Sequence, residues 1–215
     1  MSSITMILAD DHKIVRQGMR SLLEAHAGFE VIGEANDGQE ALDLMEELSP
    51  DIAFIDVMMP NLNGIEAAKI AQHRGLKTKL IFLSMHANST YVVRALQSGA
   101  MGYVLKDSDF SEILQAVQNA MDGKRYLSKN IASEVLEILL NAEGDKKDPQ
   151  NVLSVREREV LQHIAEGNTN AVVAEKLSLS VRTVEAHRAH IMAKMRFNSQ
   201  ADLVRYAIQQ GLVAL

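Results

Sequence analysis

Five short apolar runs, separated by longer segments with helical periodicity, constrain the fold of the first 120 residues more than any other feature. Two of these runs, Ile52–Ile55 and Leu80–Leu83, contain no polar residue. A strand that is apolar at every position must be covered on both faces, as in a parallel sheet flanked by helices. We therefore expect a doubly wound α/β domain with five parallel strands. The expected strands are Thr5–Ala9, Phe29–Ala35, Ile52–Asp56, Lys79–Ser84 and Gly102–Leu105.

The end of the chain has a different pattern, with no strand signal after residue 150. We expect a short helix over Asn170–Leu177 and a longer one over Val181–Met195, and the tight turn between them predicts a helix–turn–helix inside a small all-α domain. Between the two regions we expect a helix over Ile131–Asn141 and a polar, flexible stretch over 144–150. The predicted organisation is a domain over 3–122, a linker with a helical segment over 123–150 and a helical domain over 151–215.

Several helix starts carry the signature of a capping box, in which an Asp or Ser precedes a Glu by three residues. The predicted pairs are Asp37 with Glu40, Asp109 with Glu112, and Ser154 with Glu157.

The distribution of charge supports two domains of different character. Residues 1–150 hold 14 Lys and Arg against 22 Asp and Glu, a net charge of −8, whereas residues 151–215 hold 8 against 6, a net charge of +2. A small basic domain at the end of an acidic chain is compatible with reading nucleic acid at that end. The chain has no cysteine, which excludes disulfides, thiolate zinc sites and thiol catalysis.

No apolar run approaches the roughly 20 residues that span a bilayer, and no signal peptide opens the chain. We therefore expect a cytoplasmic protein without a membrane partner.

Chemically active side chains follow four of the predicted strands. They are Asp10 and Asp11 after the first, Asp56 at the end of the third, Ser84 at the end of the fourth and Lys106 after the fifth. The carboxyl ends of parallel strands meet at one edge, so these side chains should share a crevice. Three carboxylates there repel each other, and Mg²⁺ is the cation that such a set with a phosphate favours. A lysine and a hydroxyl opposite suit a phosphoryl group on one carboxylate.

Residues 3–122 resemble the receiver domain of two-component response regulators. The features that carry the resemblance are Asp10 and Asp11, Asp56–Pro60 with Gly64, Ser84 and Gly102–Lys106. The resemblance implies a flavodoxin-like sheet with strand order 2-1-3-4-5 and Asp56 as the phospho-acceptor. It implies Mg²⁺ bound by Asp11, Asp56 and the backbone carbonyl of Met58, with Asp10 acting directly or through water.

The same resemblance implies roles for neighbouring side chains. Ser84 would donate a hydrogen bond to the phosphoryl group, Lys106 would pair with it, and Tyr103 would be an aromatic switch or, alternatively, ordinary packing at a strand end. Met58 and His86 occupy positions that tune hydrolysis of the aspartyl phosphate, although His86 could equally be a solvated loop residue.

The segment Ser180–Arg196 has the charge and shape of a DNA-reading helix. The segment contains four basic residues and one acidic residue, Glu185, for a net charge of +3. Val184 and Ile191 should face the core, which leaves arginine and alanine on another face, where arginine can reach guanine edges or phosphates. The alternative is that this face of the helix is only solvated and that its arginines have no role in DNA binding. The predicted DNA-binding residues are Arg182, Thr183, Glu185, Ala186, Arg188, Ala189 and Lys194.

Residues 151–213 resemble the LuxR-type helix–turn–helix of the NarL/FixJ response regulators. The resemblance rests on Leu153 and Ser154, Arg156–Leu161, Glu166 and Gly167, and Ser180–Arg188. Ala171 departs from the pattern because it replaces a frequent lysine and removes a possible phosphate contact, and Arg196 stands where a glycine often ends the helix. The resemblance implies that the helix over Ser199–Gln210 supports a dimer on DNA, while internal packing is the simpler use of its apolar face.

We therefore predict a response regulator, and not a metabolic enzyme, that accepts a phosphoryl group on Asp56 from a histidine kinase with Mg²⁺. It would form a homodimer when phosphorylated and bind double-stranded promoter DNA. Two alternatives remain at this point: an aspartyl phosphohydrolase of the haloacid-dehalogenase type, and a receiver that only docks proteins beside an idle DNA domain.

Overall fold

The computed structural model describes residues 3–85, 89–129, 131–132, 153–209 and 212–213. The chain divides into two compact units, Met1–Ala142 and Glu143–Leu215, which are described here one at a time. Of the predicted helix over 131–141, only residues 131–132 lie inside the described part, and the predicted flexible stretch over 144–150 lies outside it.

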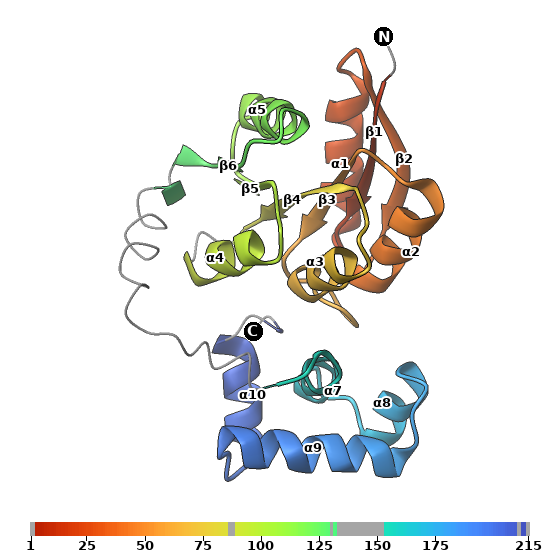
Figure 1. Cartoon of the computed structure of the whole chain (residues 1–215), viewed down its shortest axis with the longest axis vertical. Helices are drawn as coiled ribbons and strands as arrows, with labels where there is room; N and C mark the ends of the chain where they lie inside the picture. The colour runs from red at the N-terminus through yellow and green to blue at the C-terminus, as the bar shows by residue number, and fades with distance from the viewer. Residues whose placement is uncertain (1–2, 86–88, 130, 133–152, 210–211, 214–215) are drawn as a thin grey trace. The chain divides into compact units, whose positions relative to one another are not determined.

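The first unit is built on a parallel sheet with strand order β2-β1-β3-β4-β5-β6 (Figure 1). The five predicted strands are all present, and only the start of the first differs, by one residue. The strands are β1 (Ile4–Ala9), β2 (Phe29–Ala35), β3 (Ile52–Asp56), β4 (Lys79–Ser84), β5 (Gly102–Leu105) and β6 (Tyr126–Leu127). The sheet has one strand more than the five predicted: β6 has only 2 residues, too few to show a periodicity. It also lies inside the predicted linker.

Helices cover both faces of this sheet. They are α1 (Lys13–Glu24), α2 (Gly38–Leu48), α3 (Gly64–His73), α4 (Ser89–Gln97) and α5 (Phe110–Met121). Figure 1 shows α1 and α5 on one face and α2, α3 and α4 on the other. Alternate residues of β3 enter the two cores, so that Phe54 packs with Leu23 and Val117, while Ile55 belongs to the core beneath the other three helices. The uninterrupted apolar run of β3 follows from this double cover.

A buried serine fixes the short strand β6 to the rest of the sheet. The amide of Ser128 donates to the carbonyl of Tyr103 at 3.0 Å. Its hydroxyl donates to Glu112 Oε2 at 2.5 Å and accepts from the amide of Leu105 at 3.3 Å. The predicted capping box at the start of α5 was wrong in both halves: Asp109 makes no side-chain cap, and the Glu112 carboxylate is bound by Ser128 instead.

Of the other two predicted capping boxes, Ser154 and Glu157 form the reciprocal pair. The side chain of Asp37 accepts from the amides of Gln39 and Glu40, but the Glu40 carboxylate accepts from the amide of Asn36, so only half of that box is formed. These caps satisfy amide groups that have no partner within the helix.

The described residues of the second unit form four helices around one apolar core. They are α7 (Val155–Ala165), α8 (Asn170–Lys176), α9 (Val181–Met195) and α10 (Gln200–Gln209). Val160, Val184, Ile191, Leu203 and Ala207 are fully buried in this core, so the apolar face of α10 packs within its own unit. The pair α8 and α9 forms the predicted helix–turn–helix. Helix α9 ends at Met195, and Arg196 adopts the left-handed conformation, with φ of 55°, that glycine often supplies at this place.

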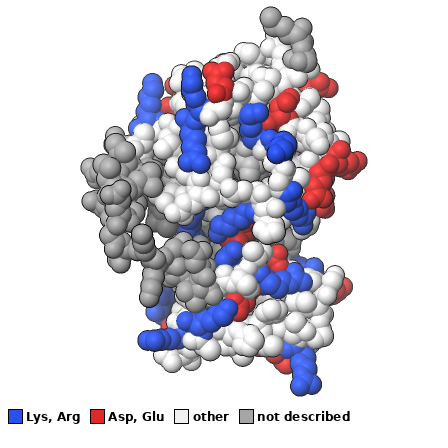
Figure 2. Space-filling model, viewed as in Figure 1, with Lys and Arg blue, Asp and Glu red and all other residues white. Residues whose placement is uncertain are grey.

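The charged residues are unevenly spread over the first unit. Helix α2 contains four acidic residues and no Lys or Arg, and acidic side chains gather over it at the edge of this unit in Figure 2. None of the helices in the described part of the chain combines the length and the apolar character needed to cross a bilayer.

Candidate functional site

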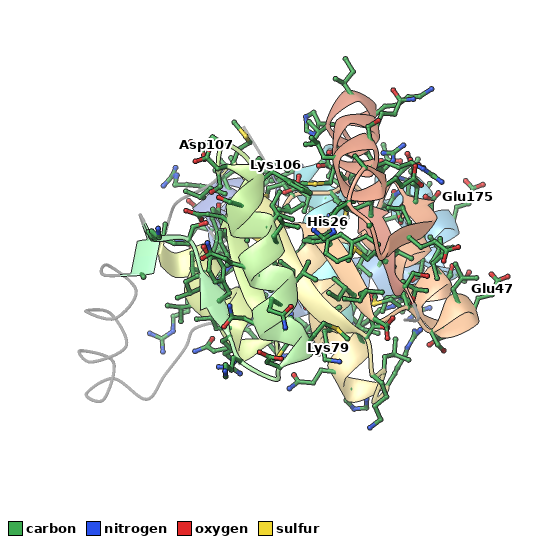
Figure 3. All side chains as sticks on the ribbon, turned by 90° about the horizontal axis from the view of Figure 1, so that it is seen from above. His26, Glu47, Lys79, Lys106, Asp107 and Glu175 are labelled. Carbon is green, nitrogen blue, oxygen red and sulfur yellow. The ribbon has the colours of Figure 1, made fainter. Side chains whose placement is uncertain are left out.

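The predicted site residues meet at one edge of the sheet, because all six strands are parallel and their carboxyl ends coincide. Figure 3 shows Lys106 and Asp107 at one end of the first unit and Lys79, the first residue of β4, at the other. The edge with Lys106 also holds the ends of β1, β3 and β4. It is therefore the edge at which ligands bind in open α/β sheets.

Three carboxylates lie together at this edge. Ligand atoms of Asp10, Asp11, His12 and Asp56 lie within 4.8 Å of one another. Asp10 and Asp56 are buried, whereas Asp11 is partly exposed. Carboxylate oxygens in this number suit a divalent cation that prefers oxygen ligands. The donor set of the cluster therefore fits Mg²⁺.

His12 is a member of this cluster that the sequence analysis missed. Its Nδ1 lies 2.7 Å from Asp11 Oδ1, and its backbone amide donates to Asp10 Oδ1 at 2.9 Å. The signal that could have found it is its position, since it follows the two aspartates directly and must leave β1 at the same edge. Its imidazole adds a nitrogen ligand or a hydrogen-bond donor to the carboxylates.

Lys106 bridges two of the carboxylates. Its Nζ lies 2.7 Å from Asp10 Oδ2 and 2.7 Å from Asp56 Oδ2, and only 6% of its side chain is exposed. Burial alone would lower the pKa of Lys106, but the charges of Asp56 and Asp10 outweigh it and raise that pKa. Lys106 is therefore an ammonium ion. It is the cation that balances the buried carboxylates among the described residues.

Burial acts on Asp56 in the opposite sense. It raises the pKa of Asp56 above its ordinary value, and the attraction of Lys106 offsets this only in part. The charged form of Asp56 is therefore costly unless a cation is near.

Ser84 and Tyr103 lie side by side beneath this edge. Both are fully buried, and the Tyr103 hydroxyl shares a hydrogen bond with Ser84. The ring of Tyr103 stacks on Phe82 with the centroids 6.2 Å apart. Burial raises the pKa of Tyr103, so its hydroxyl stays protonated and can donate. The structure thus places the predicted switch residue in an inward position, in contact with the predicted phosphate ligand Ser84.

The loop after β3 is held tightly against Asp56. The amide of Gly64 donates to the carbonyl of Val57 at 3.1 Å, and a Cβ on Gly64 would lie 2.0 Å from the Asp56 carbonyl oxygen. Only glycine allows this close approach. Met58 is half-buried and packs against the core. His86, the other predicted tuning residue, lies outside the described residues.

The predicted DNA-binding residues divide into two groups on α9. Arg182, Glu185, Ala186 and Ala189 are exposed. The other three are already bonded: Thr183 Oγ1 lies 2.8 Å from Ser180 Oγ, Arg188 donates to Gln200 Oε1 at 3.1 Å, and Lys194 pairs with Glu157 Oε2 at 2.7 Å. Glu157 is buried in α7, so the ammonium group of Lys194 is turned toward α7, although 41% of its side chain is exposed.

Two families of protein domain match this chain. The response regulator receiver domain matches residues 6–118, and the bacterial regulatory proteins of the luxR family match residues 151–207. The transcriptional regulatory protein LiaR of Bacillus subtilis (strain 168) is 37% identical over 210 residues, which are 98% of this chain and 99% of LiaR.

Solved structures agree with these matches. A two-component response regulator of the LuxR family from Aurantimonas sp. SI85-9A1 is 39% identical, with a TM-score of 0.61 over 65% of this chain and 99% of that one. The structure of two RcsB dimers bound to two parallel DNAs is 26% identical, with a TM-score of 0.61 over 97% of this chain and 99% of that one.

Proposed function

The chain belongs to the NarL/FixJ-type response regulators of two-component systems, and from this membership we propose that Asp56 is the phospho-acceptor whose state controls DNA binding. A receiver followed by a LuxR-type helix–turn–helix makes it a DNA-binding transcription regulator and not a metabolic enzyme. This sets aside the phosphohydrolase alternative.

One observation carries the proposal for Asp56. Its carboxylate ends β3 inside a cluster of acidic groups and is bonded at 2.7 Å to Lys106, a cation that also reaches Asp10. A phosphoryl group on Asp56 would find a positive donor within reach and a second donor in the hydroxyl of Ser84. We expect Asp10, Asp11, Asp56 and the carbonyl of Met58 to hold Mg²⁺. When bound, Mg²⁺ would offset the charge that accumulates as a phosphoryl group approaches.

The chemical step moves a phosphoryl group from a histidine of a sensor kinase to this chain. A carboxylate oxygen of Asp56 attacks phosphorus, the bond from phosphorus to the imidazole nitrogen breaks, and the nitrogen keeps the electron pair and takes up a proton. Lys106 pairs with a phosphoryl oxygen and so exchanges one of its carboxylate partners for the phosphate. Ser84 turns its hydroxyl to the phosphoryl group and releases Tyr103, whose movement carries the change away from the site.

We propose that three segments of the chain have different functions. Residues 3–122 form the receiver, 123–150 connect, and 151–215 bind DNA. Phosphorylation favours a homodimer, which the RcsB dimers on DNA support as a model, and two recognition helices on a two-fold axis would read half-sites about one helical turn apart. A target on chromosomal DNA puts the chain in the cytoplasm.

Labelling with a small phosphodonor tests the acceptor directly. Acetyl phosphate with Mg²⁺ should add one phosphoryl group to the intact chain, seen by mass spectrometry, and Asp56→Asn should abolish this gain. Asp43→Asn, an exposed carboxylate on α2, is the matched control and should be labelled like the unmodified chain. Full labelling of Asp56→Asn would refute the assignment. A labelled chain that selects no DNA sequence would favour the protein-docking alternative.

A further inference from the structure

The recognition helix α9 carries two arginines that point in different directions. Buried Val184 and Ile191 mark the side of α9 that faces the core. At about 100° per residue, Arg182 lies about 170° from that direction, on the same exposed side as Ala186 and Ala189. Arg188 lies only about 50° from it and is half-buried. The two arginines therefore leave α9 in directions about 120° apart.

Arg188 is oriented by a neutral partner on the next helix. Its Nη2 donates to Gln200 Oε1 at 3.1 Å, and Gln200 is the first residue of α10. A carboxamide oxygen accepts a hydrogen bond without cancelling the positive charge, and a guanidinium has five donors. Gln200 thus directs the guanidinium and leaves its charge and most of its donors for another ligand.

Both residues line a pocket of about 450 Å³ at the start of the helix–turn–helix. The remaining lining residues are Ile164 and the segment Gly167–Ala171. Arg188 is the charged residue of this lining, and polar groups of Asn168, Thr169, Asn170 and Gln200 surround it. Ala171 contributes only a methyl group. The positive charge of the pocket therefore comes from α9 and not from α8.

Glu166, the carboxylate that directly precedes Gly167 in the sequence, already has partners. It accepts from Gln162 at 3.0 Å and from Asn168 at 3.3 Å, and it lies 3.1 Å from His163 Nδ1. Thr169 Oγ1 accepts from the amide of Val172, so its hydroxyl hydrogen can be donated outward. A pocket with one guanidinium, a hydroxyl donor and neutral amides is suited to a single phosphodiester oxygen.

We propose that Arg188, positioned by Gln200, binds a phosphate of the DNA backbone, and that sequence is read by the exposed face of α9 that contains Arg182. The proposal rests on DNA binding by this domain and assigns the two arginines different tasks. A phosphate contact adds affinity for every duplex and carries no sequence information. Arg188 therefore anchors α9 in its register, while Arg182 discriminates between bases.

The test compares a duplex that the unmodified full-length chain selects from a random library with the same duplex scrambled. Arg188→Gln should weaken binding to both duplexes by the same factor, roughly tenfold. It should reduce the slope of log affinity against log salt concentration by about 1, and leave the selected sequence unchanged. Arg182→Gln, the matched control, should lose affinity mainly for the selected duplex and relax its sequence. Arg188→Lys should keep the salt slope.

The positioning role of Gln200 has its own readout. Gln200→Glu places a carboxylate against Arg188 that competes with phosphate, so affinity for both duplexes should fall, and most at low salt. Gln200→Ala should cause a smaller loss of the same kind. The proposal is overturned if Arg188→Gln shifts the selected sequence or leaves affinity and salt slope unchanged. If the unmodified chain selects no sequence, the proposed DNA-binding function fails, and this inference falls with it.

Discussion

At the scale of single residues, the site is governed by one lysine among acids. Lys106 touches Asp10 and Asp56 at equal distances, and both acids are buried. Two buried carboxylates without a cation repel each other and are poorly solvated. Lys106 therefore stabilises the two buried carboxylates. In the proposed function it would also pair with the phosphoryl group, in exchange for one of its carboxylate partners.

Removing this lysine should destabilise the receiver in a way that a divalent cation repairs. Lys106→Met should lower the free energy of unfolding of the first unit by about 3–5 kcal/mol in chelator, because it leaves buried charge without a partner. Mg²⁺ should restore part of the loss, since it binds the folded state. Hydrogen exchange measured on peptides that cover β3 reports both the loss of stability and its recovery with Mg²⁺. Lys124→Met, at an exposed ion pair of 4.0 Å, is the control and should change little.

A second residue-scale prediction concerns the glycine next to the acceptor. Gly64→Ala would place a Cβ 2.0 Å from the Asp56 carbonyl oxygen and 2.7 Å from Ile55 Cγ2. The backbone must move, at a cost of about 3 kcal/mol or more, and labelling of Asp56 should slow. Gly18→Ala on α1 meets nothing within 4 Å and should stabilise the chain by about 0.5–1 kcal/mol. If thermal unfolding shows that the two substitutions change stability equally, the close approach of Gly64 to the Asp56 carbonyl does not constrain this loop.

At the scale of elements, the short strand β6 connects the site to the segment that follows. Ser128 binds the backbone of Tyr103 and Leu105, two residues of β5, and binds Glu112 of α5. A movement of the Tyr103 backbone would therefore pass to β6 or break this contact. In the sequence, β6 lies between the receiver and the second unit, so such a movement would reach the segment that joins them.

Loss of the Ser128 hydroxyl should loosen this edge. Ser128→Ala leaves the Leu105 amide and the Glu112 carboxylate without their buried partner, at a cost of about 1–3 kcal/mol. Hydrogen exchange should rise in β5 and β6 and stay unchanged in β1. Ser21→Ala, which removes an exposed serine of α1, is the control. No change in β6 would show that pairing of the strands alone holds this edge.

The capping box of α7 predicts a dependence of stability on pH. Burial alone would raise the pKa of Glu157, but hydrogen bonds from Lys194 and Ser154 outweigh it and lower that pKa below 4.5. The stabilisation is complete above the unfolded value and is lost as pH falls through the lower, folded value. The urea midpoint of the second unit, followed by NMR signals of its methyl groups, should fall in this acid range. In Glu157→Gln the urea midpoint should depend less on pH over this range.

Pattern reasoning predicts the strands well, because β3 and β4 are covered on both faces and their apolar runs are unmistakable. It also brings Asp10, Asp56 and Lys106 together, since parallel strands share a carboxyl end. It misses β6, whose 2 residues are placed by pairing and not by periodicity. It cannot tell that Lys194 turns toward Glu157, because an error of one position changes the face by about 100°.

At the scale of the whole molecule, an acidic receiver and a basic helix–turn–helix make one switch. In the proposed function, phosphorylation takes place on a buried carboxylate of the first unit, and arginines on a helix of the second unit bind the DNA. The two units differ in how their cations are placed. Among the described site residues of the first unit, Lys106 is already paired with Asp10 and Asp56. On α9, Arg182 is exposed to solvent and Arg188 lines a pocket. The central claim is that one phosphoryl group on Asp56 changes how the second unit binds DNA.

The most direct test is the affinity of the full-length chain for its selected duplex, with and without acetyl phosphate and Mg²⁺, with the phosphorylated fraction measured by mass spectrometry. The affinity should change in proportion to the phosphorylated fraction, and Asp56→Asn should show no change under the same conditions. An affinity that stays constant while the chain is fully phosphorylated, or that changes equally in Asp56→Asn, would contradict the claim.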